Sequence, residues 1–437
     1  MDTIARVVPG SPRIAAASKP SPPGSSRERL LETGRQRFAT SGFAGARLVD
    51  IAADAGLTTG SLYRHFPSKA ALFEALFEEF ADDLFAGLVA ATDYGDYCER
   101  WLDCNRRHRG AVRAAEEVSR ENPAFLEHRR RQRRLWADAV IPHLPAGLDA
   151  RGQRLTANLT VDILDYFSFT VSRGWSDHPD ATTAANLARL VHSGLYLRDV
   201  EGVPPRRRSS PEPTGPEEDG PFKLMTWAPA PGRVEPTSRR GRAHRDEILD
   251  AAAKVFAARG FDKSGVVEIA AGAGVSPATV YRYFSDKYDI FRYLLSTVRS
   301  KLYTNALISL DDSGRMMIEP EVLEYLRVHR EHVAVYRVWR ELLDPGSEME
   351  QAWAWIRGDF QRRIARVVRF GQRGGLISAE YEPEVTAELI VASSEGPAHT
   401  LIDLGWDEGT SDAELARLLG RILGSGLEPG QTAADGP

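Results

Sequence analysis

Two stretches of the sequence follow one pattern: LTTGSLYRHFPSK at residues 57–69 and VSPATVYRYFSDK at residues 275–287. Tyr281 stands 218 positions after Tyr63 (281 − 63 = 218). The same offset relates these further pairs: Phe38 and Phe256, Gly42 and Gly260, Ile51 and Ile269, Gly56 and Gly274, Lys69 and Lys287, and Phe73 and Phe291. The match needs no gap over this span, which excludes chance similarity. The chain therefore contains one unit twice.

Each copy has the residues of a helix-turn-helix. A short helix is expected at about 48–55, and Gly56 then permits the left-handed backbone of a tight turn. Thr58 suits the N-cap of a third helix. The second copy has the equivalent helix, turn and cap at residues 266–273, Gly274 and Ser276, followed by Pro277 at the first helical position. A short helix, a glycine turn and another short helix form a helix-turn-helix.

The composition fits a soluble protein with more than two average domains. The chain has 437 residues, of which 42% are hydrophobic and 27% are charged, and its net charge is −5. No apolar run approaches the length of about 20 residues that a membrane span needs. Cys98 and Cys104 have neither a disulfide pattern nor metal-ligand spacing. We expect a cytoplasmic protein without metal, cofactor or membrane contact.

The segment TTGSLYRHFPSK, preceded by Asp50-Ile51-Ala52, resembles the recognition-helix signature of the tetracycline-repressor (TetR) family of transcriptional regulators. The resemblance covers about 27–197 and 242–427. It implies an all-α fold with two TetR-like units. Each unit would have a three-helix DNA-binding head on a helical body that binds effectors and dimerises.

The expected domain boundaries follow from the repeat and from a change in composition. Residues 202–240 are rich in proline and polar residues, which is typical of an extended linker. We expect a disordered tail at 1–26, a first head at 27–76, a first body at 77–201, a linker at 202–240, a second head at 241–295, a second body at 296–427 and a disordered tail at 428–437. The bodies also repeat, because Thr156–Val161 recurs as Thr386–Val391 at an offset of 230 (386 − 156 = 230).

The resemblance implies that the third helix of each head enters the major groove of double-stranded DNA. The candidate DNA-binding residues of the first head are Arg47, Thr58, Thr59, Gly60, Ser61, Tyr63, His65 and Lys69. Those of the second head are Ser276, Pro277, Ala278, Thr279, Tyr281, Tyr283 and Lys287. Both lysines are expected to face phosphates at a helix N-terminus, and Gly265 replaces Arg47 in the second head. The alternative is that Tyr63 and Tyr281 only pack the heads.

Tyr336, Trp339 and Arg340 are the candidate effector-binding residues, because two aromatic rings and a cation at this spacing suit an apolar pocket with one charged anchor. Such a pocket would take a small apolar or amphipathic molecule. The alternative is ordinary packing, which explains most apolar stripes on helices.

The resemblance implies a ligand-responsive repressor. The sequence does not indicate an enzyme, since it lacks a nucleophile elbow, a Walker loop and a dinucleotide glycine pattern. We expect the last two helices of each body to pair within one chain, so that two non-identical heads read an asymmetric operator. A homodimer with four heads is the alternative arrangement. A constitutive architectural DNA-binding protein is the main alternative function, and an enzyme built on the helical bodies ranks third.

Overall fold

The computed structural model describes residues 24–176, 178–196, 236, 238–304, 309–310, 316–317, 319–343, 346–375, 377–404 and 409–427. Nearly all of the expected tails and linker lie outside these residues. The described chain is helical apart from one antiparallel pair of two-residue strands, β1 (Ser309–Leu310) and β2 (Met316–Met317). None of the described helices is long and apolar enough to cross a membrane.

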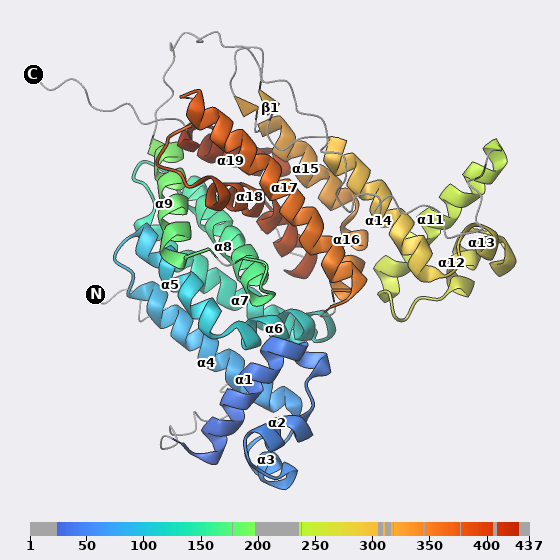
Figure 1. Cartoon of the computed structure of the whole chain (residues 1–437), viewed down its shortest axis with the longest axis horizontal. Helices are drawn as coiled ribbons and strands as arrows, with labels where there is room; N and C mark the ends of the chain where they lie inside the picture. Colours follow the sequence, from blue (N-terminus) through green and yellow to red (C-terminus); the bar gives the residue numbers. More distant parts are fainter. Residues whose placement is uncertain are drawn as a thin grey trace, which may run out of the picture.

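The first unit consists of a three-helix head and a helical body (Figure 1). The head contains α1 (Ser26–Gly45), α2 (Leu48–Asp54) and α3 (Thr59–His65). The body contains α4 (Lys69–Val89), α5 (Tyr94–Arg107), α6 (Arg109–Glu121), α7 (Pro123–Val140), the 3-10 helix η2 (Ile141–His143), α8 (Ala150–Ser172) and α9 (Asp180–Tyr196).

The second unit repeats this order of helices. Its head contains α11 (Arg239–Arg259), α12 (Val266–Gly272) and α13 (Pro277–Tyr283). Its body contains α14 (Lys287–Thr304), α15 (Glu319–Glu331), α16 (Val333–Glu341), α17 (Glu348–Arg373), α18 (Pro383–Leu404) and α19 (Asp412–Leu427). The strand pair lies between α14 and α15, where the first unit continues directly from α4 to α5.

The helix caps and turns that the sequence predicts in the heads are confirmed. The Thr58 hydroxyl accepts a hydrogen bond from the Ser61 backbone N–H at 3.2 Å, and Ser276 accepts one from Thr279 at the same distance. Each bond, together with one to the carbonyl of the same cap residue, satisfies an N–H group in the first turn of the helix. Gly56 has a φ of 66°, a left-handed conformation that side chains with a Cβ rarely adopt. Local chemistry therefore fixes where each recognition helix begins.

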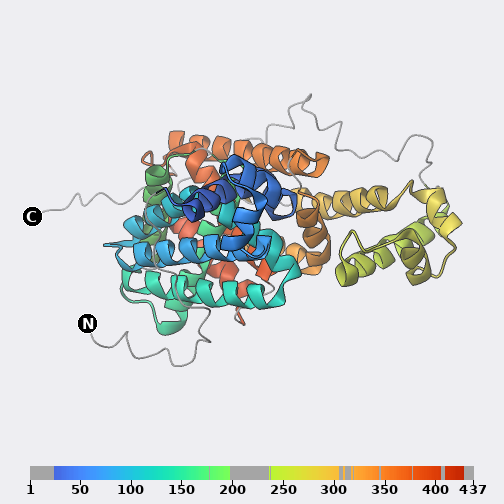
Figure 2. The same ribbon diagram turned by 90° about the horizontal axis from the view of Figure 1, so that it is seen from below.

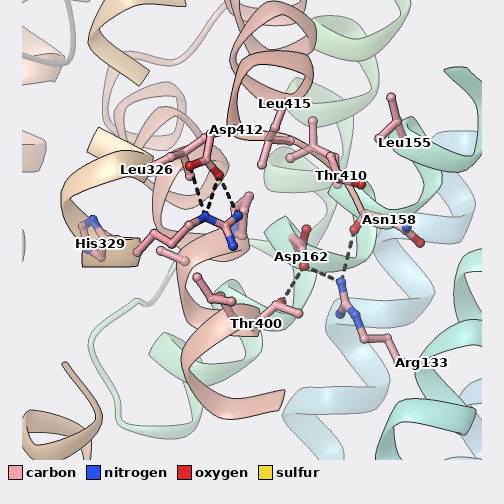
Figure 3. A pocket seen from close by; sticks show the side chains of 15 residues that line it. Arg133, Leu155, Asn158, Asp162, Leu326, His329, Thr400, Thr410, Asp412 and Leu415 are labelled. Carbon is pink, nitrogen blue, oxygen red and sulfur yellow. Dashed lines mark hydrogen bonds and ion pairs between the residues drawn. The ribbon is translucent and has the colours of Figure 1, made fainter. Parts of the chain in front are cut away.

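The two bodies pack against each other through α8 with α18 and α9 with α19. Gly396 lets α18 approach α8 closely, because a Cβ there would lie 2.5 Å from the Asp162 carbonyl oxygen. Asp162 also accepts hydrogen bonds from Arg133 of the first body and from Thr400 of the second (Figure 3). Arg330 and Asp412, both of the second body, form an ion pair at 2.6 Å in the wall of the pocket drawn in Figure 3. Close helix packing and the buried hydrogen bond from Thr400 to Asp162 therefore hold the boundary between the bodies.

The heads attach to the bodies in unequal ways. In the first unit α1 packs closely on α6, since a Cβ at Gly110 would lie 2.0 Å from the Arg35 carbonyl oxygen. In the second unit α11 packs on α16, where the position equivalent to Gly110 is Ala334. A Cβ at this position prevents an equally close approach. Figure 2 shows the second head, in yellow-green, projecting from one side of the paired bodies.

Candidate DNA-binding and effector sites

The first recognition helix presents its predicted DNA-binding residues to solvent. Leu62 is fully buried in the head, whereas 53% of the surface of Tyr63 is exposed. Thr58, Gly60 and His65 are also exposed, and Thr59 and Ser61 are half-buried. Hydroxyl groups at the start of α3 and an exposed aromatic ring suit contacts to base edges and phosphates.

The second recognition helix has a different surface in the same place. Pro277 and Ala278 are exposed, and the half-buried Thr279 lies with its hydroxyl 3.0 Å from the Ser276 hydroxyl. Tyr281 has 47% of its surface exposed. Tyr283 is half-buried and its hydroxyl accepts a hydrogen bond from Arg282 at 3.0 Å, so it is less accessible than its counterpart His65. The second head thus offers a more apolar start to its helix.

The phosphate contact expected of Lys69 and Lys287 stays a prediction, and the structure gives each ammonium backbone partners within its own head. The Lys69 ammonium donates to the carbonyl oxygens of Phe43, Ala44 and Ala46 at 2.7, 3.2 and 3.1 Å. Lys287 donates to three carbonyls of the equivalent segment at 2.9 to 3.3 Å. An ammonium has three N–H donors, and all three are used here. Each lysine therefore holds the segment between the first two helices of its head.

Arg47 is exposed, but its guanidinium is bound to a neighbouring carboxylate. Nε and Nη2 donate to the two oxygens of Asp50 at 2.9 and 2.8 Å. The hydrogen bond from Arg47 lowers the pKa of Asp50, so the pair is ionised at neutral pH. A phosphate contact by Arg47 would have to be made beside this ion pair or replace it.

Sequence reasoning missed one glutamate in each unit that joins the body to the head. Glu117 of α6 accepts a hydrogen bond from the Ala44 backbone N–H at 2.7 Å, and Glu341 of α16 accepts one from Phe261 at 2.8 Å. Burial raises the pKa of Glu117. The repeat contained a signal for this pair, because His108, Arg113 and Glu117 recur 224 positions later as His332, Arg337 and Glu341 (341 − 117 = 224).

The structure places Tyr336 and Trp339 in the wall of a pocket in the second body. The expectation for Arg340 is wrong, because this residue does not line that pocket. Its guanidinium points at the first body, where it lies 3.6 Å from Glu116 and 3.9 Å from the centroid of the Phe169 ring. Tyr336 and Arg340 are four residues apart and share a face of α16, so helical spacing alone does not separate them. The difference lies in the neighbours that each side chain meets, because Arg340 contacts Glu116 and Phe169 of the first body.

The pocket has mainly aromatic and aliphatic walls with two charged residues, Arg357 and Glu395. Arg357 forms an ion pair with Glu388 and donates to the Trp175 carbonyl at 3.3 Å. Glu395 accepts a hydrogen bond from the Tyr325 hydroxyl, and burial raises its pKa. The remaining lining residues are Tyr166, Leu295, Tyr336, Trp339, Trp353, Ile356, Phe360 and Val391. Tyr166 belongs to the first body, so both units contribute to this pocket.

Comparison with known proteins identifies the family. The profile for bacterial regulatory proteins of the tetR family matches residues 30–76 and again residues 248–294. The transcriptional repressor KstR2 of Mycolicibacterium smegmatis is 31% identical over 139 residues, which make up 29% of this chain and 68% of that protein. The chain belongs to the TetR family. Its two TetR heads make it a DNA-binding transcriptional regulator.

Other relatives are also similar to part of the chain. The repressor BepR of Brucella suis is 25% identical over 161 residues, which cover 35% of this chain and 77% of that protein. The A-factor receptor protein of Streptomyces griseus is 30% identical over 192 residues, covering 43% of this chain and 64% of that protein. The solved structure of the fatty acid degradation regulator FadR from Bacillus halodurans matches 44% of this chain and 97% of its own with 18% identity. Its TM-score of 0.31 adds nothing to the TetR assignment.

Proposed function

We propose that this TetR-family chain is a ligand-responsive repressor whose two bodies pair within the chain and whose two heads read an asymmetric operator. One observation carries the pairing: equivalent residues of the two units touch each other. Glu116 and Arg340, related by the offset of 224, lie 3.6 Å apart. Phe169 and His399, related by the offset of 230, have ring centroids 4.8 Å apart. A residue at a twofold axis meets its own counterpart, so both contacts support a pseudo-twofold axis between the bodies.

The same contacts favour pairing within the chain over a homodimer. Two copies of the first body would place Glu116 against Glu116, and two copies of the second would place Arg340 against Arg340. Like charges in a buried position cost several kcal/mol. In addition, the counterpart of Gly396 in the first body is Tyr166 (396 − 166 = 230), whose side chain would occupy the site of close helix contact. Each body therefore complements the other better than it complements itself.

The difference between the recognition helices supports an asymmetric operator. The first head offers Thr59 and Ser61 as hydrogen-bonding groups, whereas the second offers the ring of Pro277 and the methyl of Ala278. Hydroxyls bind base-edge donors and acceptors, and apolar groups prefer thymine methyls. Two such surfaces prefer two different half-sites.

The position of α16 supports a response to a ligand. This helix carries Tyr336 and Trp339 in the pocket wall and, two residues later, Glu341, which holds the second head. A ligand that shifts α16 therefore changes the attachment of that head. A ligand alters the equilibrium between two states only if it binds one of them better.

The same helix also contacts the first unit. Arg340 pairs with Glu116 of α6, and Arg120 of α6 donates to the Arg340 carbonyl at 2.9 Å. The residue after Glu116 is Glu117, which holds the first head. One pocket in the second body thus has a path of direct contacts to both heads.

Light scattering of the protein–DNA complex tests the pairing. The operator is first obtained by selection from random duplex DNA with the full chain. One chain on a non-palindromic site is the expected result. Two chains on a palindromic site would refute the proposed pairing.

The proposed ligand response is tested with any small molecule that binds the protein. If such a molecule leaves the operator affinity unchanged, the response is refuted and a constitutive DNA-binding protein is favoured.

A further inference from the structure

We propose that the pocket in the second body binds an amphipathic organic cation, with Glu395 as the counter-charge and the aromatic rings as the apolar wall. This inference rests on the proposed ligand response of the same pocket. It specifies the chemical class of the effector more narrowly than an apolar or amphipathic molecule.

The first argument is the number of aromatic rings around the pocket. Tyr336 and Trp339 are stacked with centroids 6.4 Å apart, and Trp339 lies 4.3 Å from Trp353. The rings of Tyr166, Tyr325 and Phe360 complete the aromatic lining. The face of an aromatic ring is electronegative and attracts a cation within about 6 Å. Several rings around one space can therefore bind both the charge and the apolar part of such a ligand.

The second argument is the charge balance of the surrounding residues. Arg357 and Arg340 act on Glu395 at long range, but Arg357 is paired with Glu388, and Arg340 lies against Glu116. Among the residues that the structure describes, no basic side chain lies within 4.0 Å of the Glu395 carboxylate. Glu395 is thus the carboxylate of this group without an ion pair in the described structure.

A ligand cation would supply the positive counter-charge that the Glu395 carboxylate lacks. A buried carboxylate without a counter-ion is costly, and this cost is why burial raises the pKa of Glu395. The Tyr325 hydroxyl donates to one oxygen of the carboxylate and fixes its position. An ammonium group near the carboxylate would stabilise its ionised form. An anionic ligand would instead be repelled by the Glu395 carboxylate. The guanidinium of Arg357 would not compensate, because it is already paired with Glu388.

Three probes with the same alkyl chain test this proposal on the full-length protein: decyltrimethylammonium, decanol and decanoate. Each is titrated below its micelle concentration while tryptophan fluorescence and calorimetry report binding. The ammonium is expected to bind about tenfold more tightly than the other two, a difference of about 1.4 kcal/mol. Glu395→Gln is expected to remove this preference and leave the affinity for decanol unchanged. Glu414→Gln, which removes a half-buried carboxylate that is paired with Arg151 outside the pocket, is the control and is expected to keep the preference.

Three results would overturn the proposal: no binding of the ammonium, decanoate binding as tightly as the ammonium, or an unchanged preference in Glu395→Gln. The comparison of probes on the unmodified protein decides the matter even if that variant does not fold. Operator affinity is measured separately with each probe. Ammonium binding without DNA release would refute the ligand response and leave the ligand class standing. If only decanoate or decanol releases the DNA, the cationic ligand class is refuted and the ligand response stands.

Discussion

The burial of His329 predicts that the protein loses stability in mild acid. Its imidazole is almost fully buried between the rings of Tyr325 and Tyr336, with centroids 4.2 and 4.1 Å away, and Nδ1 lies 2.9 Å from the Tyr325 carbonyl oxygen. Burial lowers the pKa of His329 from its usual 6.5 to about 4. Between these values the unfolded chain binds a proton that the folded chain does not. The free energy of unfolding therefore falls as the pH falls through this interval.

The size of the effect follows from the difference between the usual pKa of 6.5 and the pKa of about 4 in the folded protein. Each unit corresponds to about 1.4 kcal/mol, and the two titrations together give a loss of about 2 kcal/mol at pH 5 and about 3 kcal/mol at pH 4. His329→Phe keeps an aromatic ring in the stack and removes the titrating group. Compared with the wild type, this variant should lose less stability on acidification, by these amounts.

Urea unfolding at several pH values between about 7 and 4 measures the difference between wild type and variant at each pH. Taking this difference cancels the carboxylates that both proteins share. His65→Phe removes an imidazole from an exposed position and serves as the control. If the stability of wild type and His329→Phe falls in parallel with pH, the imidazole does not titrate as its burial requires, and the reasoning is refuted.

Four further substitutions test other contacts. Gly396→Ala should destabilise the pairing of the bodies by about 1–3 kcal/mol, because its Cβ would lie 2.5 Å from the α8 backbone; Gly424→Ala, with nothing within 4 Å, is the control, and equal urea midpoints would contradict this. Tyr63→Ala should lower DNA affinity by about 1–3 kcal/mol without changing the melting temperature. Lys69→Ala should lower the melting temperature, because three carbonyl oxygens would lose their hydrogen-bond donor. Gel-shift titration measures the DNA affinity of each variant, and calorimetry measures its melting temperature. Hydrogen bonds from Ser411 and from Arg151 lower the pKa of Glu414 to about 2, so its contribution to stability should disappear as the pH falls from about 4.5 to 2. The melting temperatures of wild type and Glu414→Gln should then converge. A difference that stays constant with pH would contradict this prediction.

The features that sequence predicts well depend on neighbouring residues. Thr58 caps α3 through the N–H of Ser61, three positions away, and the turn at Gly56 needs only a residue that tolerates positive φ. Such local chemistry is visible in a single stretch of sequence. The role of Lys69 was not visible, because its three carbonyl partners lie more than twenty positions earlier and are brought near only by the fold of the head.

The pocket of the second body shows the same limit of sequence-based prediction. Helical spacing predicts that Tyr336 and Trp339 share a face, but it does not predict which neighbour that face meets. Glu395, the residue on which the ligand class depends, reaches the pocket from α18, and Tyr166 comes from the other unit. Their positions depend on the packing of the two bodies, which the sequence indicates only as a repeat at an offset of 230. The same packing places Arg340 against Glu116 of the first body and outside the pocket lining.

The contact between Glu116 and Arg340 has a consequence for how such a gene can change. In a homodimer, any residue at the symmetry axis must tolerate an identical copy of itself. Once two units share one polypeptide, each side of the axis can mutate alone, and complementary pairs such as Glu with Arg or Phe with His become accessible. Recombination that copies one body over the other would then restore identical residues at the axis and weaken the protein. A chain with two copies of one body would therefore lose the complementary contacts at the proposed axis.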